Sequence, residues 1–219
     1  MILIGRGVYS YSDAASLTQL KSARIREWFA SRSEAKLGAI FQSDFTGQTE
    51  HPLISFLDLV DVFIAGQLRN SGMSLQTLRR IYRTLQQDYG VEHPFGRREL
   101  LTDGTKIFFA GLDSRGCKEV VDVLTKKKAF PTIILPFLKR LTFDPSSRLA
   151  TKWQISKGVV VNPVICFGQP VLESKGIPTN IIARSSKANG GDLRTVADWY
   201  DMPVSQVKLA LEFEARRAA

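Results

Sequence analysis

The stretch from 159 to 182, VVVNPVICFGQPVLESKGIPTNII, restricts the fold of its part of the chain more than any other segment. Pro163, Pro170 and Pro178 each lack an amide donor and fix φ, so any strands between them must be short, bent or at a sheet edge. Two glycines in the same stretch allow backbone conformations that residues with a Cβ resist. We therefore expect a small, rigid β platform here.

A helical pair is expected after this platform. Asp192 can cap one helix and Ser205 the next, because a side-chain oxygen there accepts from free amide groups. Asp201-Met202-Pro203 makes the turn between them. The apolar residues expected to face inward are Leu193, Val196, Ala197, Tyr200, Val207, Ala210 and Leu211. The pair has the shape of a helix-turn-helix.

A clearer helix-turn-helix pattern lies near the start of the chain, in YSDAASLTQLKSARIREWF from 11 to 29. Ser12 or Asp13 can cap a first short helix, and Ser22 can cap a second. Thr18-Gln19-Leu20 makes the break between them. Such a pair can place its second helix in the major groove of DNA.

The second helix of this pair has one apolar side and several basic residues. Ile25, Trp28 and Phe29 fall at i, i+3 and i+4, so they share a face toward the core. An ordinary helical pair with a solvated basic face is the alternative interpretation. Lys21, Ser22, Arg24 and Arg26 are expected to contact DNA from the recognition helix. Arg32 is expected to contact the phosphate backbone of the DNA.

The charge of the chain fits that expectation. The formal net charge is +9 and the pI is about 9.7, so the protein attracts polyanions, although an acidic protein or an anionic membrane fits the charge equally well. The most apolar stretches, Leu57 to Ala65 and Ile133 to Leu138, are too short to span a bilayer. We expect a cytoplasmic protein with no membrane association.

Metal and cofactor sites are not expected. The chain has 2 cysteines and 2 histidines, and neither pair has the spacing of metal ligands. Two carboxylate pairs at helical spacing, Asp58 with Asp61 and Glu119 with Asp122, lack an accompanying histidine, phosphate-binding loop or nucleophile motif. We expect no enzyme activity.

The middle of the chain alternates helices and strands. Leu37 to Gln48 is strand-like, in the place of a wing, and Ser55 to Leu68 is apolar on nearly all sides, as in a buried helix. Gly72 and Ser74 separate it from a second long helix. That helix has an apolar stripe and, opposite, arginines that are either solvated or contact phosphate. These arginines are Arg79, Arg80 and Arg83.

The next segment predicts a hairpin, Glu99 to Gly111, with Asp103-Gly104 as its turn. Residues 116–143 look helical, with a kink at Pro136. Asp144 to Ser147 is the best domain boundary. The predicted fold is mainly α with small β elements (α+β): a winged helix-turn-helix domain at 1–115, a helical connector at 116–145 and a platform with helix-turn-helix at 146–219.

Two resemblances follow from these motifs. Residues 8–90, with a turn at Leu68 to Arg80 that matches the family pattern "lr..Gmsl..ir", resemble the DNA-binding region of MerR-type regulators. No long dimerisation coiled coil follows here. Residues 155–214, with NPVICFGQPVL, GIPT and LRTVADWYDMPVSQVKLALEFE in order, resemble the antitoxin-like domain of unknown function 433. Together the chain resembles VapB-type antitoxins.

The resemblance implies an antitoxin of a type II toxin–antitoxin system that binds a PIN-domain ribonuclease and represses its own promoter. An arginine can block the metal-binding carboxylates of such a nuclease. The C-terminal tail, which we expect to be frayed, presents the candidate toxin-binding residues Phe213, Arg216 and Arg217. Basic residues that only complement a helix C-terminus are the alternative.

A homodimer is expected, because paired DNA half-sites match a two-fold protein. A stand-alone MerR-like transcription regulator without a toxin partner remains the alternative function.

Overall fold

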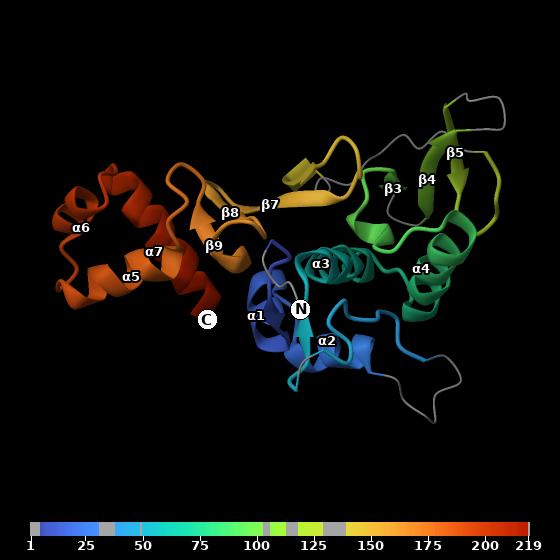
Figure 1. The fold of residues 1–219 in the computed structure, drawn as a ribbon, viewed down its shortest axis with the longest axis horizontal. Helices are drawn as coiled ribbons and strands as arrows, with labels where there is room; N and C mark the ends of the chain where they lie inside the picture. The colour runs from blue at the N-terminus through green and yellow to red at the C-terminus, as the bar shows by residue number, and fades with distance from the viewer. Residues whose placement is uncertain are drawn as a thin grey trace. The chain divides into compact units, whose positions relative to one another are not determined.

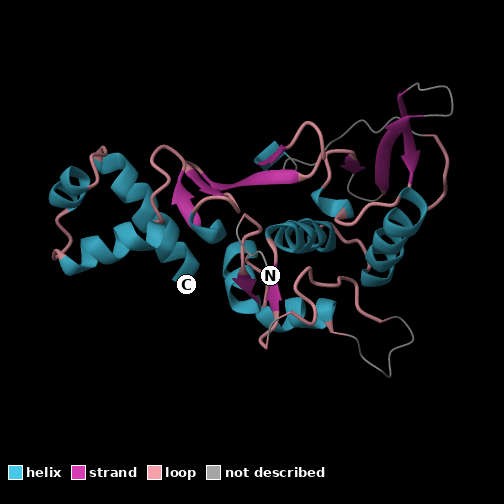
Figure 2. Cartoon of the chain, viewed as in Figure 1, coloured by secondary structure: helices cyan, strands magenta, loops and turns pink. Residues whose placement is uncertain are grey.

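The computed structural model describes residues 5–30, 38–48, 50–102, 106–112, 118–128 and 139–218. The chain divides into two compact units. The first, which we call the N-terminal unit, comprises Tyr9–Thr151. The second, the C-terminal unit, comprises Lys152–Ala219 together with Met1–Val8. Figure 1 colours the chain from blue to red in sequence order, and Figure 2 separates helices from strands.

Four helices build most of the N-terminal unit: α1 (Tyr11–Thr18), α2 (Ser22–Phe29), α3 (Phe56–Asn70) and α4 (Leu75–Tyr89). Short polar caps fix where three of them begin. Ser10 and Asp13 form a capping box at α1; the N-cap is Ser10, two residues before Ser12, the earlier of the two caps predicted there. Ser55 and Asp58 form another at α3, and Ser74 caps α4 as predicted.

Helix α3 lies at the centre of this unit, between α1 and α4 (Figure 1). It is buried on nearly all sides, as its apolar sequence predicts. Aromatic rings lie beside it: Phe41 and Tyr82 have centroids 4.8 Å apart, and Tyr82 and Phe95 have centroids 5.2 Å apart, both edge to face. Phe95 belongs to the 3₁₀ turn η1 (Pro94–Gly96), which packs against α3.

One glycine sets how closely the helix-turn-helix approaches α3. A Cβ built on Gly66 would lie 2.8 Å from Cδ1 of Leu20, the residue in the turn between α1 and α2. Glycine at this position therefore allows the turn to lie directly on the central helix. A larger residue would require Leu20 to move.

Small strands complete the N-terminal unit. β1 (Tyr9–Ser10) pairs with β2 (Leu53–Ile54), and a three-stranded sheet has the order β3-β4-β5. The three-stranded sheet consists of β3 (Leu100–Thr102), β4 (Ile107–Leu112) and β5 (Lys118–Asp122). The predicted hairpin is confirmed as the antiparallel pair β3 and β4, whereas its turn lies outside the described residues.

Two sequence predictions are corrected here. Residues 38–48 form an irregular loop with a turn at 44–48, not the strand predicted as part of a wing. Helix was predicted over 116–143, but 118–122 form β5 and β6 (Leu141–Phe143) is also a strand. Successive β-branched valines at 120 and 121 suit a pleated strand better than a helix. Residues 129–138, with Pro136, lie outside the described residues.

The Asp144-Pro145-Ser146-Ser147 cluster forms a turn. The Asp144 carboxylate accepts from the amides of Ser146 (3.0 Å) and Ser147 (2.6 Å), and the Asp144 amide donates to Leu149 (2.9 Å). This turn joins β6 to β7 (Ala150–Ser156). The division between the two units follows at 151/152, within β7.

The C-terminal unit combines short strands with helices (Figure 2). β7 pairs with β8 (Val159–Val161), which pairs with β9 (Pro170–Leu172). The helices are α5 (Thr179–Ala188), α6 (Leu193–Trp199) and α7 (Val204–Ala218). The predicted short strands and the α6–α7 pair are confirmed, whereas α5 was not predicted. Ser205 lies inside the first turn of α7 and is not its cap.

The proline-rich string forms the expected platform of short strands, with tight turns between them. Cys166, Phe167 and Gly168 all have left-handed φ, at 46°, 55° and 83°. The Val8 amide donates to the Phe167 carbonyl (3.2 Å), so the segment before Tyr9 belongs to this unit. The hydroxyl of Thr179 lies near the Pro170 carbonyl (3.3 Å), which fixes α5 to β9.

The protein has an α+β fold of helices and small antiparallel sheets. Among the described residues, none of the helices has the length and apolar character needed to cross a bilayer.

Candidate nucleic-acid interface

A tight turn joins helices α1 and α2. Gln19 ends α1 in the left-handed conformation (φ 59°), and the Leu20 amide donates to the Ala15 carbonyl (3.2 Å). Lys21 occupies the cap position of α2 without a side-chain hydrogen bond. Ser22, predicted as that cap, is the first residue of the helix.

One side of α2 is packed into the unit and the other is open. Ile25 is 0% exposed and Trp28 is 2% exposed, as the sequence predicts. Lys21, Arg24 and Arg26 are exposed, and Ser22 is half-buried. Arg32, the fifth candidate DNA contact, lies outside the described residues.

The two arginines of α2 lie on opposite flanks of its open side. At about 100° per residue, Arg24 and Arg26 are about 160° apart around the helix axis. Ala23 and Glu27, both exposed, lie between them. The centre of the open side therefore carries a small residue and a carboxylate, with a long cation on each flank. The flanking cations can reach phosphates on both sides of a groove, whereas the Glu27 carboxylate is repelled by phosphates.

The loop after α2 holds the C-terminal end of that helix in place. The amides of Ile40 (2.8 Å) and Phe41 (3.1 Å) both donate to the Trp28 carbonyl. The Phe41 ring packs edge-on against Trp28, with centroids 6.0 Å apart. The orientation of α2 therefore depends on the position of this loop.

A buried ion cluster fixes the loop in turn. We use this term for His93, Asp44, Asp58 and Asp61. His93 lies between two carboxylates: its Nδ1 is 3.0 Å from Asp61 Oδ2, and its Nε2 is 3.1 Å from Asp44 Oδ1. Asp58 Oδ1 is 3.9 Å from Nδ1. The cluster thus connects the loop, α3 and the segment before η1.

Backbone amides satisfy the remaining oxygens of the two buried aspartates. Asp61 Oδ1 accepts from the amides of Phe95 and Gly96 (both 3.0 Å), while Tyr82 donates to Oδ2 (2.8 Å). Asp58 Oδ2 accepts from the amides of Ser55 (2.9 Å) and Asp44 (3.1 Å). Buried charges are tolerated when they are bonded in this way.

The electrostatics of the cluster favour a charged histidine. Burial opposes the charged form, but the hydrogen bonds to Asp44 and Asp61 outweigh it and raise the pKa of His93 to about 11. Burial raises the pKa of Asp58 to about 6, against the lowering effect of the Ser55 amide. The cluster therefore contains an imidazolium among carboxylates at neutral pH.

A metal ion does not fit this cluster well. Ligand atoms of Asp44, Asp58 and His93 lie within 4.8 Å of one another, which is compatible with a cation. However, both ring nitrogens of His93 already lie at hydrogen-bond distance from carboxylates, and a metal ligand must be unprotonated. We interpret the cluster as a set of internal ion pairs that fixes the loop against which α2 packs.

Sequence reasoning missed this cluster. It paired Asp58 with Asp61 and assigned them no histidine, whereas the structure brings His93 to them from 32 residues away. No local spacing signals such a contact. The other candidate pair, Glu119 with Asp122, lies on β5 and not on a helix.

The three arginines of α4 are partly exposed. Arg80 and Arg83 are exposed, and Arg79 is half-buried, with an Nε that has no hydrogen-bond partner among the described residues. Burial and the neighbouring Arg83 lower the pKa of Arg79.

The predicted toxin-binding residues lie in α7, which is helical to Ala218; the frayed tail predicted there is not observed in the described residues. Phe213 is 7% exposed and contributes to the core. Arg216 is exposed and donates to Ser156 Oγ (2.8 Å). Arg217 lies 3.8 Å from the Glu214 carboxylate, a surface ion pair.

The C-terminal unit also exposes large apolar side chains. Val164 is 72% exposed, Phe167 62% and Trp199 61%. Exposed aromatic side chains of this kind are enriched at protein–protein interfaces.

Comparison with solved structures supports the fold. The chain is similar to the X-ray crystal structure of Rv2018 from Mycobacterium tuberculosis, with a TM-score of 0.65 and 19% sequence identity, over 93% of this chain and 96% of that chain. At this identity the likeness concerns the fold alone. No family model and no curated protein matches the sequence.

Proposed function

We propose that this protein is an antitoxin of a type II toxin–antitoxin system, which binds the promoter DNA of its operon through α2 and neutralises a PIN-domain ribonuclease. The observation that carries the DNA-binding half is the open side of α2. There Lys21, Arg24 and Arg26 are exposed while Ile25 and Trp28 fix the helix from behind.

The physical basis of DNA binding is charge and groove geometry. Arginine and lysine side chains neutralise phosphates and release counterions, and side chains on the recognition helix reach base edges. In this binding mode Arg24 and Arg26 extend to either side of the groove, and Ser22 lies nearer the packed side. The net charge of +9 adds long-range attraction.

A gel-shift titration against the promoter fragment tests this half. We expect Arg24→Ala and Arg26→Ala each to weaken binding about tenfold and to reduce the salt slope by about 1. Arg98→Ala, which removes an exposed arginine from the same unit, is the control for net charge. Unchanged affinity and unchanged salt slope in both α2 variants would contradict the assignment.

The toxin-binding half is supported by the resemblance to antitoxins and by the exposed apolar side chains of the C-terminal unit. In this proposal α7 presents Arg216 and Arg217 to the acidic site of the nuclease. Arg216 then exchanges its bond to Ser156 for the carboxylates of the partner. Because Phe213 is buried, its contribution is to hold α7 in place.

A rescue assay tests the toxin-binding half. The neighbouring open reading frame is expressed in a surrogate host with and without this chain, and growth is scored. Toxicity that this chain relieves supports the proposal, and Arg216→Ala with Arg217→Ala is then expected to reduce the rescue. Arg194→Ala, an exposed arginine on α6, is the matched control.

A stand-alone DNA-binding regulator is the second candidate. It is favoured because Arg216 and Arg217 already contact side chains of their own unit, Ser156 and Glu214. In that case the neighbouring gene product is harmless alone, while the gel-shift result is unchanged. In either case we propose a homodimer, because two helix-turn-helix units then match paired half-sites. Light scattering on the purified chain measures its mass directly.

A further inference from the structure

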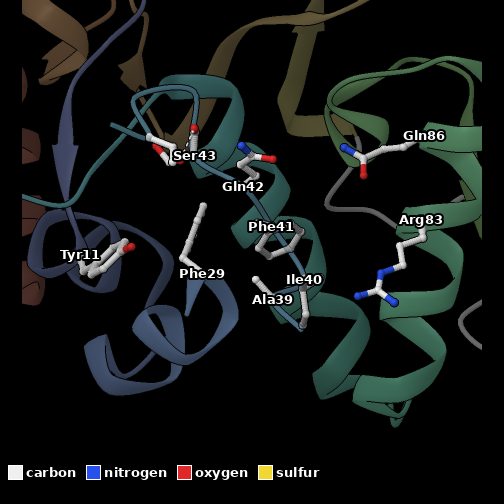
Figure 3. Close-up of a pocket in the computed structure, with 10 residues that line it drawn as sticks. Tyr11, Phe29, Ala39, Ile40, Phe41, Gln42, Ser43, Arg83 and Gln86 are labelled. Carbon is white, nitrogen blue, oxygen red and sulfur yellow. Dashed lines mark hydrogen bonds between the residues drawn. The ribbon is translucent and has the colours of Figure 1, made fainter. Parts of the chain in front are cut away.

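The large apolar side chains that the described chain exposes all lie in the C-terminal unit. They are Val164, Phe167, Ile181 and Trp199. In the N-terminal unit, by contrast, the aromatic side chains of Tyr11 and Phe29 are half-buried and line a pocket (Figure 3). The open apolar surface is therefore a property of the C-terminal unit, and such surfaces are typical of contacts with another protein.

Two of these side chains, Ile181 and Trp199, lie on helices that contact each other. The hydroxyl groups of Ser185 and Tyr200 are 2.8 Å apart and join α5 to the end of α6. At about 100° per residue, Ser185 lies about 40° from Ile181 around the axis of α5. Tyr200 directly follows Trp199 in the chain. Ile181 therefore lies close to the side of α5 that meets the end of α6, and Trp199 lies next to that contact.

The open face of α5 is apolar along its centre and basic at its outer edge. Ala188, about two turns after Ile181, is exposed together with it. Arg184 lies about 60° from Ile181 in the direction away from Ser185, and Lys187 lies about 60° further round. Both basic side chains are exposed, and neither makes an ion pair or a hydrogen bond within the described ranges. The basic edge of α5 is therefore the edge remote from α6.

The opposite edge of this surface, on α6, carries an acidic group. Around the axis of α6, Trp199 lies between Tyr200 and Asp198, at about 100° from each. Since Tyr200 contacts α5, Asp198 lies on the side of α6 away from α5. The Asp198 side chain is exposed and makes no ion pair or hydrogen bond in the part of the chain that the structure describes. The surface, which we call the α5–α6 face, therefore runs from cation to apolar centre to anion: Arg184, Ile181 and Ala188, Trp199, Asp198.

A surface with this order of charges is complementary to itself. A two-fold axis through its apolar centre places the basic edge of one copy against the acidic edge of the other, and does so twice. A partner with a single sign of charge would attract one edge and repel the other. The charges therefore favour a second copy of the same surface over an acidic or a basic protein.

We propose that the α5–α6 face binds a second copy of this chain. Trp199 packs on Ile181 and Ala188 of the partner subunit. Asp198 pairs with Arg184 of the partner subunit, and the reverse pair forms across the axis. This contact locates the homodimer of the proposed function and rests on that proposal for the dimer alone. Val164 and Phe167, in the segment before β9, are not used by it.

The mass of the full chain in solution tests the dimer. In sedimentation equilibrium we expect twice the mass of one chain at about 100 μM, with a Kd for dissociation on the order of 1–10 μM. A monomer at the highest concentration would overturn the proposal.

Tryptophan fluorescence tests where the dimer contact lies. The chain has 3 tryptophans, of which Trp28 is 2% exposed, Trp153 1% and Trp199 61%. Quenching by iodide, which does not enter the protein core, therefore follows Trp199. We expect quenching to fall severalfold as the chain is concentrated through the Kd of the dimer. A dimer in which Trp199 is quenched as strongly as in the monomer would overturn the proposal.

Charge reversal tests the pairing itself. Arg184→Asp and Asp198→Arg each place like charges opposite one another at both contacts, and each is expected to raise the Kd about tenfold. A mixture of the two variants is expected to return to the affinity of the wild type, because every pair in the mixed dimer is again of opposite sign. Lys208→Asp is the control, since Lys208 is exposed on the side of α7 opposite the buried Ala210, and it should leave the Kd unchanged.

The mixture also separates a lost contact from a damaged fold, because a misfolded variant would not recover when mixed. Trp199→Ala is expected to raise the Kd at least about tenfold, as for a central tryptophan of an interface, with an unchanged circular dichroism spectrum. The proposal is overturned if the mixture dimerises no better than either variant alone. It is also overturned if Trp199 is protected only after the product of the neighbouring gene is added, since the face then binds that protein.

These measurements of the dimer need neither DNA nor a toxin. A dimer that forms through the α5–α6 face but does not bind the promoter fragment would refute the DNA-binding half of the proposed function and leave this proposal intact. A monomer that binds the promoter and relieves the toxicity would do the reverse.

Discussion

The two units of this protein bury polar groups in different ways. In the N-terminal unit, the buried side chains include Asp58, Asp61, His93, Glu99 and Asp122. In the described part of the C-terminal unit, the buried polar side chains are Thr179 and Ser186, both uncharged hydroxyls. Its core is built from valines of β8 and β9 and from apolar residues of the helices.

The two units therefore specify their folds in different ways, one mainly by apolar packing and the other also by buried charges. An apolar core tolerates small changes in volume and is insensitive to pH. A buried ion cluster requires every partner, because the removal of one leaves an uncompensated charge. The unit that carries the candidate recognition helix is therefore the one whose geometry depends on a network of charges.

The largest expected effect is the loss of His93. His93→Gln leaves three carboxylates close together without their cation, and should lower the free energy of unfolding of the N-terminal unit by about 3–5 kcal/mol. Hydrogen exchange resolved by peptide measures this unit separately from the other. His51→Gln, the same change at an exposed histidine, should have almost no effect. Equal effects at both positions would show that the cluster does not stabilise the unit.

The next effect is a dependence on pH. The pKa of His93 is about 11 in the folded protein, above its unfolded value of about 6.5. The resulting stabilisation is complete below about pH 6.5 and is lost as the pH rises toward 11. Between pH 7 and pH 9 we expect the N-terminal unit to lose about 3 kcal/mol. Asp58, with a pKa of about 6, has finished titrating below this window.

The same pH series serves as an internal comparison. His93→Gln should remove the slope in the N-terminal unit. Peptides of the C-terminal unit should keep their protection over this range, because its described core contains no charged side chain. If the stability of the N-terminal unit still falls with pH in His93→Gln, another group causes the pH dependence.

A smaller effect is expected in the C-terminal core. Ile182 is 0% exposed, and Ile182→Val should destabilise this unit by about 1 kcal/mol through the loss of one buried methyl group. The change should be equal at pH 7 and pH 9, as measured by the same exchange experiment. A pH-dependent change would show that the two units are not distinguished by their buried groups.

The smallest expected effect is an increase in the stability of the C-terminal unit. Phe167 is exposed and has a left-handed φ of 55°, which costs a residue with a Cβ more than it costs glycine. Phe167→Gly should stabilise the C-terminal unit by about 0.5 kcal/mol, after its greater unfolded-state entropy is deducted. Denaturant titration detects this difference; a loss of stability would indicate that the ring contributes to packing.

The sequence predicted those elements whose signals are local. Ser55 and Ser74 begin α3 and α4 through bonds to residues three positions away, and Asp192 caps α6 in the same way. The apolar face of α2 follows from the spacing of Ile25 and Trp28. Such contacts can be found by counting along the chain.

Features formed by distant residues could not be predicted in this way. The contact of His93 with Asp61 depends on how separate elements pack. The error over 118–122 has a different cause, because a short valine-rich segment fits a buried helix and a strand equally well until its neighbours are known. Phe213 shows the same limit, since it is buried in α7, a helix that packs against α5, α6 and β8.

The pairing of Val8 with Phe167 has a consequence for synthesis. Residues 5–8 leave the ribosome before the N-terminal unit, but the partner of Val8 is made about 160 residues later. The unit spanning 9–151 can fold while the rest of the chain is still being translated. The segment that precedes it can pair only after the residues around Phe167 have been synthesised, so it joins its own unit later than the unit that follows it in the chain.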